Sequence, residues 1–159
     1  MNDKITINII QPEDADAVYA IEEEVFADNF PWPREWFDDA VSGEDGGYVY
    51  VAHYENQLAG FCIMYHNTNM EAHDFHYCKI GNIAVKPEFR GKQIGRALMM
   101  QMLKRAAELG LDRIKLETSE KNTAAISLYK SLGFKITDTL PGYYGDAEDG
   151  FVMWLHTQA

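Results

Sequence analysis

Residues 83–97 join an apolar, strand-like run to glycines and basic side chains at the start of a helix. The run Ile83-Ala84-Val85 precedes a short turn and the segment Arg90-Gly91-Lys92-Gln93-Ile94-Gly95-Arg96-Ala97. The first N–H groups of a helix have no partner inside the helix, and the helix dipole adds positive potential there, so this segment can bind an anion. Gly91 and Gly95 allow a diphosphate to approach the backbone closely. Three side chains add positive charge: Arg90, Lys92 and Arg96.

Close packing of a helix against a strand explains the same two glycines, so this spacing alone leaves a packing role open. The segment lacks the Gly-x-Gly-x-x-Gly spacing of dinucleotide-binding proteins and the full Walker pattern. Neither a nicotinamide cofactor nor ATP is therefore favoured.

A second motif, residues 116–134, places a carboxylate in a strand and a phenol in the helix that follows. Glu117 can accept a proton and Tyr129 can donate one, as in general acid–base catalysis. Each also has a structural explanation. Glu117 can be a solvated strand carboxylate paired with Lys115 or a neighbour, and Tyr129 can be an aromatic residue of the core.

Together the two regions resemble the GCN5-related N-acetyltransferase (GNAT) superfamily. The first is similar to its Arg/Gln-x-x-Gly-x-Gly/Ala motif for acetyl-CoA at Arg90–Ala97. Within the superfamily, nearly the whole chain is similar to the bacterial ribosomal-protein alanine N-acetyltransferases of the RimI type. The matching segments are Phe30-Pro31-Trp32, Asn82-Ile83-Ala84-Val85, Leu116-Glu117, Asn122-x-x-Ala125, Leu128-Tyr129, Leu132-Gly133-Phe134, Tyr143-Tyr144 and Glu148-Asp149.

The resemblance implies that acetyl-CoA is the cosubstrate. In this family the pantetheine arm pairs like an extra strand with the backbone of the first matched run, and the diphosphate takes N–H groups from the helix start. The expected cofactor-binding residues are Ile83, Ala84, Val85, Arg90, Gly91, Lys92, Gln93, Ile94, Gly95, Arg96, Asn122, Ala125 and Tyr129.

The resemblance also assigns catalytic roles. Glu117 matches the general base, Tyr129 matches the general acid that protonates the departing thiolate, and the Val85 N–H matches the oxyanion donor. The implied reaction is direct attack of an amine on the thioester. The implied acceptor is the N-terminal α-amine, alanine foremost, of a protein such as a ribosomal protein. An α-amine of pKa about 8 is easier to deprotonate than a lysine near 10.4, so one carboxylate suffices.

Two aromatic loops are expected to hold the acceptor, and the residues concerned are Phe30, Trp32, Tyr143 and Tyr144. Packing of these rings onto the core is the competing explanation. A cationic peptide terminus suits the carboxylates that flank both loops, which are Asp28, Asp38, Asp39, Asp146, Glu148 and Asp149. Two other functions stay open: acetylation of lysine side chains or small amines, and a non-catalytic acetyl-CoA sensor.

Three features depart from the family pattern. The loop at 67–74 is long, Lys86 stands where an acidic residue is common, and Pro141-Gly142 precedes the tyrosine pair where a basic residue is more frequent. The peptide recognised is therefore open. His66, His73 and His76 lie in or beside the long loop, but no carboxylate or cysteine completes a ligand set, so we expect no metal.

The chain has 159 residues and a net charge of −11, distributed unevenly. Residues 1–78 carry two basic and sixteen acidic side chains, whereas residues 79–135 carry twelve basic and five acidic ones. The acidic total argues against nucleic-acid or membrane partners. With no apolar segment of membrane-spanning length, we expect a cytoplasmic protein. Cys62 and Cys78 are expected to be buried free thiols, and the oligomeric state is left open.

Apolar periodicity and turn residues predict alternating strands and helices in one domain spanning 1–159. The fold class is α/β (α+β), and the resemblance implies a GNAT fold with a mixed sheet of about seven strands and four flanking helices. Strands are expected at 4–10, 48–54, 58–65, 76–85, 112–118, 134–140 and 150–156, and helices at 12–27, 34–41, 94–109 and 122–132.

Overall fold

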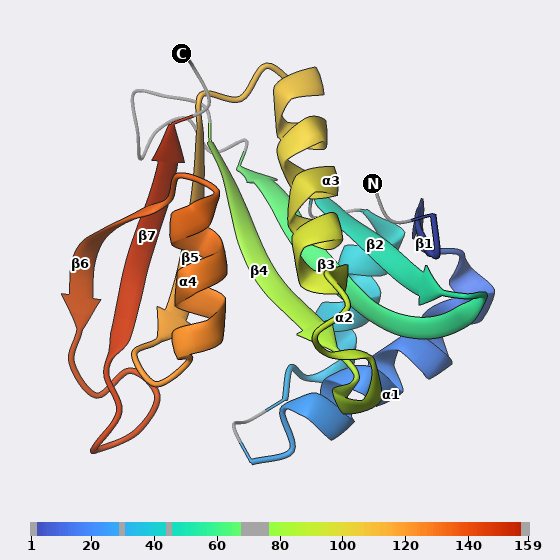
Figure 1. The fold of residues 1–159 in the computed structure, drawn as a ribbon, viewed down its shortest axis with the longest axis horizontal. Coiled ribbons are helices and arrows are strands. Elements are labelled where there is room, and N and C mark those ends of the chain that lie inside the picture. Colours follow the sequence, from blue (N-terminus) through green and yellow to red (C-terminus); the bar gives the residue numbers. More distant parts are fainter. Residues whose placement is uncertain (1–2, 29–30, 44–45, 68–76, 157–159) are drawn as a thin grey trace. The chain divides into compact units, whose positions relative to one another are not determined.

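A computed structural model describes residues 3–28, 31–43, 46–67 and 77–156 (Figure 1). Seven strands form one mixed sheet in the order β1-β2-β3-β4-β5-β7-β6, and four α-helices lie in the described ranges. This confirms the predicted fold class. The strands are β1 (Ile5–Ile9), β2 (Gly47–Tyr54), β3 (Gln57–Asn67), β4 (Tyr77–Val85), β5 (Arg113–Ser119), β6 (Lys135–Leu140) and β7 (Gly150–His156), and the helices are α1 (Ala15–Val25), α2 (Arg34–Ser42), α3 (Ile94–Glu108) and α4 (Thr123–Ser131).

The chain divides into two compact units. The first draws on residues 1–66 and 81–105, and the second on residues 67–80 and 106–159. Strand β4 therefore contributes its C-terminal half to the first unit and its N-terminal half to the second. The single domain expected over residues 1–159 stays a prediction.

Helices α1 and α2 share one apolar core with the sheet of the first unit (Figure 1). The helical spacing of Val18 and Ile21 turns both side chains to this core, and the strand alternation of Phe61 and Ile63 does the same in β3. Gly60 permits β3 to lie close to β4, because a Cβ built there would stand 2.5 Å from the carbonyl oxygen of Ala84.

The strands predicted at 48–54 and 58–65 are confirmed, and they pair as a hairpin. Its two central residues, Glu55 and Asn56, both have positive φ angles, of 48° and 67°. Such a pair is typical of the two-residue turns that match the twist of antiparallel strands. Cys62 and Cys78 are buried free thiols, as predicted, and burial raises the pKa of Cys78 to about 12.

The second unit pairs β5 with β4 in parallel and with β7 in an antiparallel register. Alternate residues of β5 are buried, among them Ile114 and Leu116. The intervening residues, Lys115 and Glu117, point to the opposite face. Asn122 caps α4, because its Oδ1 accepts the Ala125 N–H at 3.3 Å.

Several predicted boundaries need correction. The segment expected to open a helix at Pro12 is a 3₁₀ turn over Pro12–Asp14, and α1 ends at Val25 rather than near 27. Strand β3 continues to Asn67, into the expected loop, whose remaining residues 68–74 lie outside the described residues. A further 3₁₀ turn, Pro87–Phe89, was not expected; proline is well suited to such a start because its φ is fixed. None of the described helices is long and apolar enough to cross a membrane.

Candidate active site

The backbone between β4 and α3 is shaped for an anion. Gly91 has a φ of +78° and Gln93 a φ of +69°. Inside α3 the first N–H donor in a helical bond is Ala97, which donates to the Gln93 carbonyl at 3.0 Å. The N–H groups of Ile94 and Gly95 precede that bond, so they lie among the unpaired donors of the helix start. A Cβ built at Gly91 meets no atom within 4 Å, so the loop is open on that side. These features fit the diphosphate of acetyl-CoA.

The basic side chains of this loop differ in their surroundings. Arg90 is exposed, whereas Lys92 and Arg96 are half-buried. The Lys92 ammonium lies 5.2 Å from the centre of the Tyr54 ring, which itself packs against Phe89. Lys92 is therefore held against Tyr54 rather than extended into solvent.

The backbone N–H groups of the strand before the loop alternate between the β3 side and the opposite side. The Lys86 N–H donates to the Ala59 carbonyl of β3 at 2.8 Å. Because N–H groups alternate in direction along a strand, the Val85 and Ile83 N–H groups point away from β3. Ile83 N–H donates to the Oδ1 of its neighbour Asn82 at 3.0 Å. The role of the Val85 N–H as oxyanion donor stays a prediction.

A buried carboxylate ties this strand to the predicted acceptor loop. Glu22 of α1 is 1% exposed, and it accepts the Trp32 backbone N–H at 3.1 Å and the Asn82 side-chain amide at 2.7 and 2.6 Å. Burial raises the pKa of Glu22, while the hydrogen bonds from Trp32 and Asn82 oppose that shift. The sequence analysis missed this residue, although a glutamate four positions after Val18 lies on the apolar face of the helix.

Trp32 is fixed on several sides. Its ring stacks on Tyr65 with centroids 6.0 Å apart, and its carbonyl accepts the Tyr19 hydroxyl. Gly81 leaves room for the indole, since a Cβ there would stand 2.9 Å from it. The ring is partly buried against the core, and its contact with the acceptor stays a prediction. Its predicted partner Phe30 lies outside the described residues.

Glu117 lies in a group of charged and phenolic side chains on the second unit. Its Oε2 is 3.1 Å from Lys79 Nζ and accepts the Tyr143 hydroxyl at 3.3 Å, and its Oε1 is 3.8 Å from Lys115 Nζ. The ion pair with Lys115 or a neighbour, weighed from the sequence, is therefore present. The pairing also shows that part of the basic segment 79–135 serves Glu117 rather than the anion loop.

Tyr129 is buried in α4, at 5% exposure, and packs against Phe134. Burial raises its pKa to about 12. The phenol is thus a weaker acid than an ordinary tyrosine of pKa near 10, and it stays protonated over the whole working range of pH.

The tyrosine pair lies in the turn between β6 and β7. Tyr143 is 54% exposed and meets Tyr144 edge to face, with ring centroids 5.0 Å apart. Burial raises the pKa of Tyr144, and so do the charges of Tyr143, Glu117 and Tyr129. A Cβ at Gly150 would stand 3.0 Å from the Tyr144 ring, so a side chain there would require the ring to shift.

Several carboxylates near the predicted acceptor loops already have partners. Asp38 pairs with Arg34 at 2.8 Å, and Glu148 accepts the Ser119 hydroxyl at 2.8 Å. Asp149 accepts the Gly142 N–H at 2.9 Å. These contacts stabilise the loops, and they also partly neutralise the negative charge of the carboxylates.

The predicted site residues fall into two groups. The first unit holds Trp32 and the cofactor-binding residues from Ile83 to Arg96, and the second unit holds Glu117, Asn122, Ala125, Tyr129, Tyr143 and Tyr144. Within the second unit, the structure brings Glu117 and Tyr143 into contact and places Tyr144 within range of both Glu117 and Tyr129. Asn122 is used as the cap of α4.

Lys79 is a second residue that the sequence analysis missed. Lys79 stands opposite Lys115 in the β4–β5 register, and Glu117 follows Lys115 by two positions in β5. This register brings the Lys79 side chain into contact with Glu117. The alternation of charged residues in each strand can be seen in the sequence, but the register between two parallel strands cannot.

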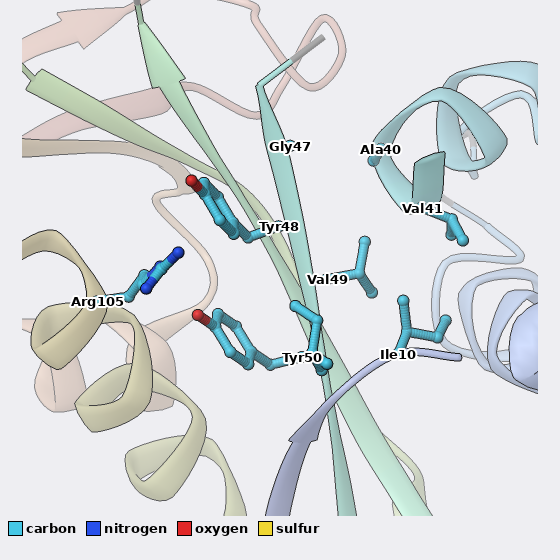
Figure 2. Close-up of a pocket in the computed structure, with 9 residues that line it drawn as sticks. Ile10, Ala40, Val41, Gly47, Tyr48, Val49, Tyr50 and Arg105 are labelled. Carbon is cyan, nitrogen blue, oxygen red and sulfur yellow. The ribbon is translucent and has the colours of Figure 1, made fainter. Parts of the chain in front are cut away.

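A pocket of about 440 Å³ lies in the first unit, where the N-terminal part of β2 meets the end of β1 (Figure 2). Val49 and Ile10 line one side of it, and Tyr48, Tyr50 and Arg105 line the other. Arg105 lies 4.9 Å from the centre of the Tyr48 ring. None of the predicted site residues lines this pocket.

Comparisons with known proteins agree with this geometry. The model of the acetyltransferase (GNAT) family matches residues 15–134. A Bacillus subtilis protein provisionally named ribosomal protein bS18-alanine N-acetyltransferase is 30% identical, over 98% of this chain and 97% of its own length. The crystal structure of the ribosomal-protein-S18-alanine N-acetyltransferase from Escherichia coli superposes with a TM-score of 0.83 at 28% identity, covering 98% of this chain and 95% of that one. Arabidopsis thaliana NAA60, solved with acetyl-CoA, has the same fold, with a TM-score of 0.82 at 20% identity over 96% of this chain and 98% of that one.

Proposed function

The chain belongs to the acetyltransferase (GNAT) family and uses acetyl-CoA as its cosubstrate, and from this premise we propose that it acetylates the N-terminal α-amine of a protein. We propose alanine as the first residue of the acceptor. The first candidate for the acceptor protein is a ribosomal protein of the S18 type. The similarity to the alanine N-acetyltransferases of B. subtilis and E. coli supports this choice.

One observation carries the proposal. Glu117 and Tyr143 are in contact, and Tyr144 lies near both Glu117 and the buried Tyr129. A proton acceptor, a proton donor and two aromatic rings therefore occur together on the second unit. These are the groups that amine acetylation requires besides the thioester.

In the proposed mechanism, the acceptor nitrogen attacks the thioester carbon, forming the N–C bond. Glu117 takes the proton that the nitrogen loses. The Val85 N–H donates a hydrogen bond to the carbonyl oxygen as negative charge develops there. The C–S bond then breaks, and the Tyr129 hydroxyl donates its proton to the departing thiolate.

The raised pKa of Tyr129 is compatible with this acid role. A free thiol has a pKa near 8.5, so an isolated phenol of pKa about 12 is a poor donor to its thiolate. However, a thiolate formed beside Tyr129 is also an anion in an apolar environment, and desolvation raises its proton affinity too. The pKa values of the phenol and of the departing thiol are therefore better matched inside the protein than the value for the thiol in water suggests.

The first unit is proposed to hold the cosubstrate. Gly91, Gln93 and the start of α3 would take the diphosphate, and the Ile83–Val85 backbone would take the pantetheine arm. Arg90, Lys92 and Arg96 would supply positive charge. Trp32 and the two tyrosines of the β6–β7 turn would contact the acceptor peptide.

Thiol release from acetyl-CoA tests the acceptor directly. The panel contains short peptides that begin with alanine, serine or methionine, an N-acetylated alanine peptide with an internal lysine, and spermidine. We expect turnover on the free alanine terminus. Turnover on lysine or spermidine alone would contradict the acceptor and keep the family chemistry, and tight acetyl-CoA binding with no turnover would favour the sensor function.

A further inference from the structure

Glu117 is surrounded by more positive than negative charge. Two ammonium groups, of Lys79 and Lys115, lie 3.1 and 3.8 Å from its two oxygens. The Tyr143 hydroxyl donates to the oxygen that Lys79 also contacts. A carboxylate with these partners is already fully compensated before an acceptor arrives.

The strand register builds this arrangement. Lys79 and Lys115 are neighbours across β4 and β5, and Glu117 follows Lys115 by two positions, so all three side chains lie on one face. The Glu117 side chain is 16% exposed and that of Lys79 is 40% exposed. Charges in such a half-buried position are screened less than charges in open water.

The β6–β7 turn also brings Glu148 to this face of β5, where it accepts the Ser119 hydroxyl at 2.8 Å and lies 3.6 Å from Lys121 Nζ, so that ammonium offsets its charge. From β7, the residue opposite Glu117 is Val152, which carries no charge. From the β6–β7 turn, Tyr143 contacts the carboxylate and Tyr144 lies near it, and burial raises the pKa of both phenols. Both tyrosines are therefore neutral at working pH, and the group of Lys79, Lys115 and Glu117 carries one net positive charge.

We propose that Lys79 is a specificity residue that excludes the ammonium form of the acceptor, so that only the neutral amine reaches Glu117. This inference rests on the proposed function and names the substrate class of the same site: amines of low basicity, such as a protein N-terminus. The neutral amine attacks the thioester, and the proton it loses on forming the N–C bond passes to Glu117. The leaving thiolate takes its proton from Tyr129, and the proton gained by Glu117 replaces it by exchange through water, so both residues return to their starting states and the protons balance.

Selection for the neutral form discriminates strongly between the two kinds of protein amine. At pH 7.5 an α-amine of pKa about 8 is roughly one quarter neutral, whereas a lysine of pKa about 10.4 is about 0.1% neutral. Basicity alone therefore favours the N-terminus by about 200-fold. A site with an unpaired carboxylate would reduce this preference, because it would bind either amine as an ammonium ion.

Lys79→Met tests the inference, with Lys104→Met on the exposed face of α3 as the matched control. Thiol release is measured with an alanine-terminated peptide and with an N-acetylated peptide that carries one lysine. Without Lys79, the ratio of kcat/KM for alanine over lysine should fall by about tenfold, because an ammonium ion can then pair with Glu117. Lys79→Arg keeps the charge and should restore the wild-type ratio, and Lys104→Met should not change it.

The pH profile is a second measurement that a merely structural role would not alter. In the wild type, kcat/KM for the alanine peptide should rise with pH up to the pKa of the peptide's own amine. In Lys79→Met the rise should begin at lower pH, by about half a unit to one unit, because the charged amine also binds.

The outcomes separate this inference from the proposed function. An unchanged ratio and an unchanged pH profile in Lys79→Met overturn the role of Lys79 and leave the α-amine acceptor intact. Equal or faster wild-type turnover of the lysine peptide overturns the proposed acceptor. If neither peptide reacts, a series of small primary amines with different pKa values replaces them. The wild type should then prefer the amines of low pKa, and this preference must be weaker in Lys79→Met.

Discussion

Glu22 and Asn82, sixty residues apart in the sequence, are joined by two short contacts: the Asn82 Nδ2 lies 2.7 Å from one oxygen of the carboxylate and 2.6 Å from the other. Glu22 also accepts the Trp32 N–H, and Asn82 also accepts the N–H of Ile83. One buried carboxylate therefore connects the predicted acceptor loop with the strand predicted to bind the pantetheine arm.

This connection predicts a paired substitution experiment. Glu22→Gln should lower the free energy of unfolding by about 1–3 kcal/mol, because its amide nitrogen would face the Asn82 nitrogen, donor against donor. Asn82→Asp alone should be at least as damaging, because two buried carboxylates would then meet. The double variant Glu22→Gln with Asn82→Asp restores one donor and one acceptor, and it should recover much of the loss.

Denaturant unfolding of the four proteins gives the coupling free energy of this double-mutant cycle. The KM for the acceptor peptide should follow the same order, since Trp32 is anchored by Glu22. Additive losses in stability would show that the two side chains act independently and would contradict the connection.

Gly91 offers a matched test of the anion loop. Gly91 and Gly110 both have left-handed φ angles, of 78° and 70°, and a Cβ at either meets no atom within 4 Å. Alanine at either position should therefore cost a similar amount of stability, about 1 kcal/mol, from backbone strain alone. Only Gly91→Ala should weaken acetyl-CoA binding, by about tenfold, because it displaces the N–H donors at the start of α3. Calorimetric titration measures both affinities, and equal affinities in the two variants would exclude Gly91 from the cosubstrate site.

Tyr129→Phe tests the proposed general acid. Loss of the hydroxyl should reduce kcat by about 100-fold or more, the usual size of general acid catalysis, and leave the affinity for acetyl-CoA unchanged. Tyr48→Phe, a tyrosine of the pocket in the first unit, is the matched control and should retain activity. Wild-type turnover by Tyr129→Phe would remove Tyr129 from the mechanism.

The sequence predicted the elements well because their patterns are local. The apolar runs of β2 and β3, the Asn122 cap and the glycines that end α3 and α4 each depend on neighbouring residues. The family resemblance added what periodicity cannot supply, namely the GNAT fold and the roles of Glu117 and Tyr129. Those roles stay predictions.

The partners of the site residues could not be predicted, because they depend on contacts between distant segments. Lys79 reaches Glu117 through the β4–β5 register, and Glu22 reaches Asn82 through the packing of α1 on the sheet. The upward shift of the Tyr129 pKa depends on burial of the phenol. From the sequence, burial could be inferred only from the apolar face of the helix. In each case the residue type was visible and its environment was not.

The buried phenol of Tyr129 also predicts how stability changes in alkali. Its pKa is about 12 in the folded protein and about 10 in the unfolded chain, so folding favours the protonated form. Below pH 10 both states are protonated and the group has no effect. As pH rises from 10 to 12 only the unfolded chain ionises, so the free energy of unfolding falls by about 1.4 kcal/mol per pH unit, or about 3 kcal/mol in all. Phenylalanine cannot ionise, so Tyr129→Phe should lose less stability over this range than the wild type. Denaturant unfolding at several pH values between 9 and 11.5 measures the difference, and parallel curves for the two proteins would show that Tyr129 is not desolvated in solution.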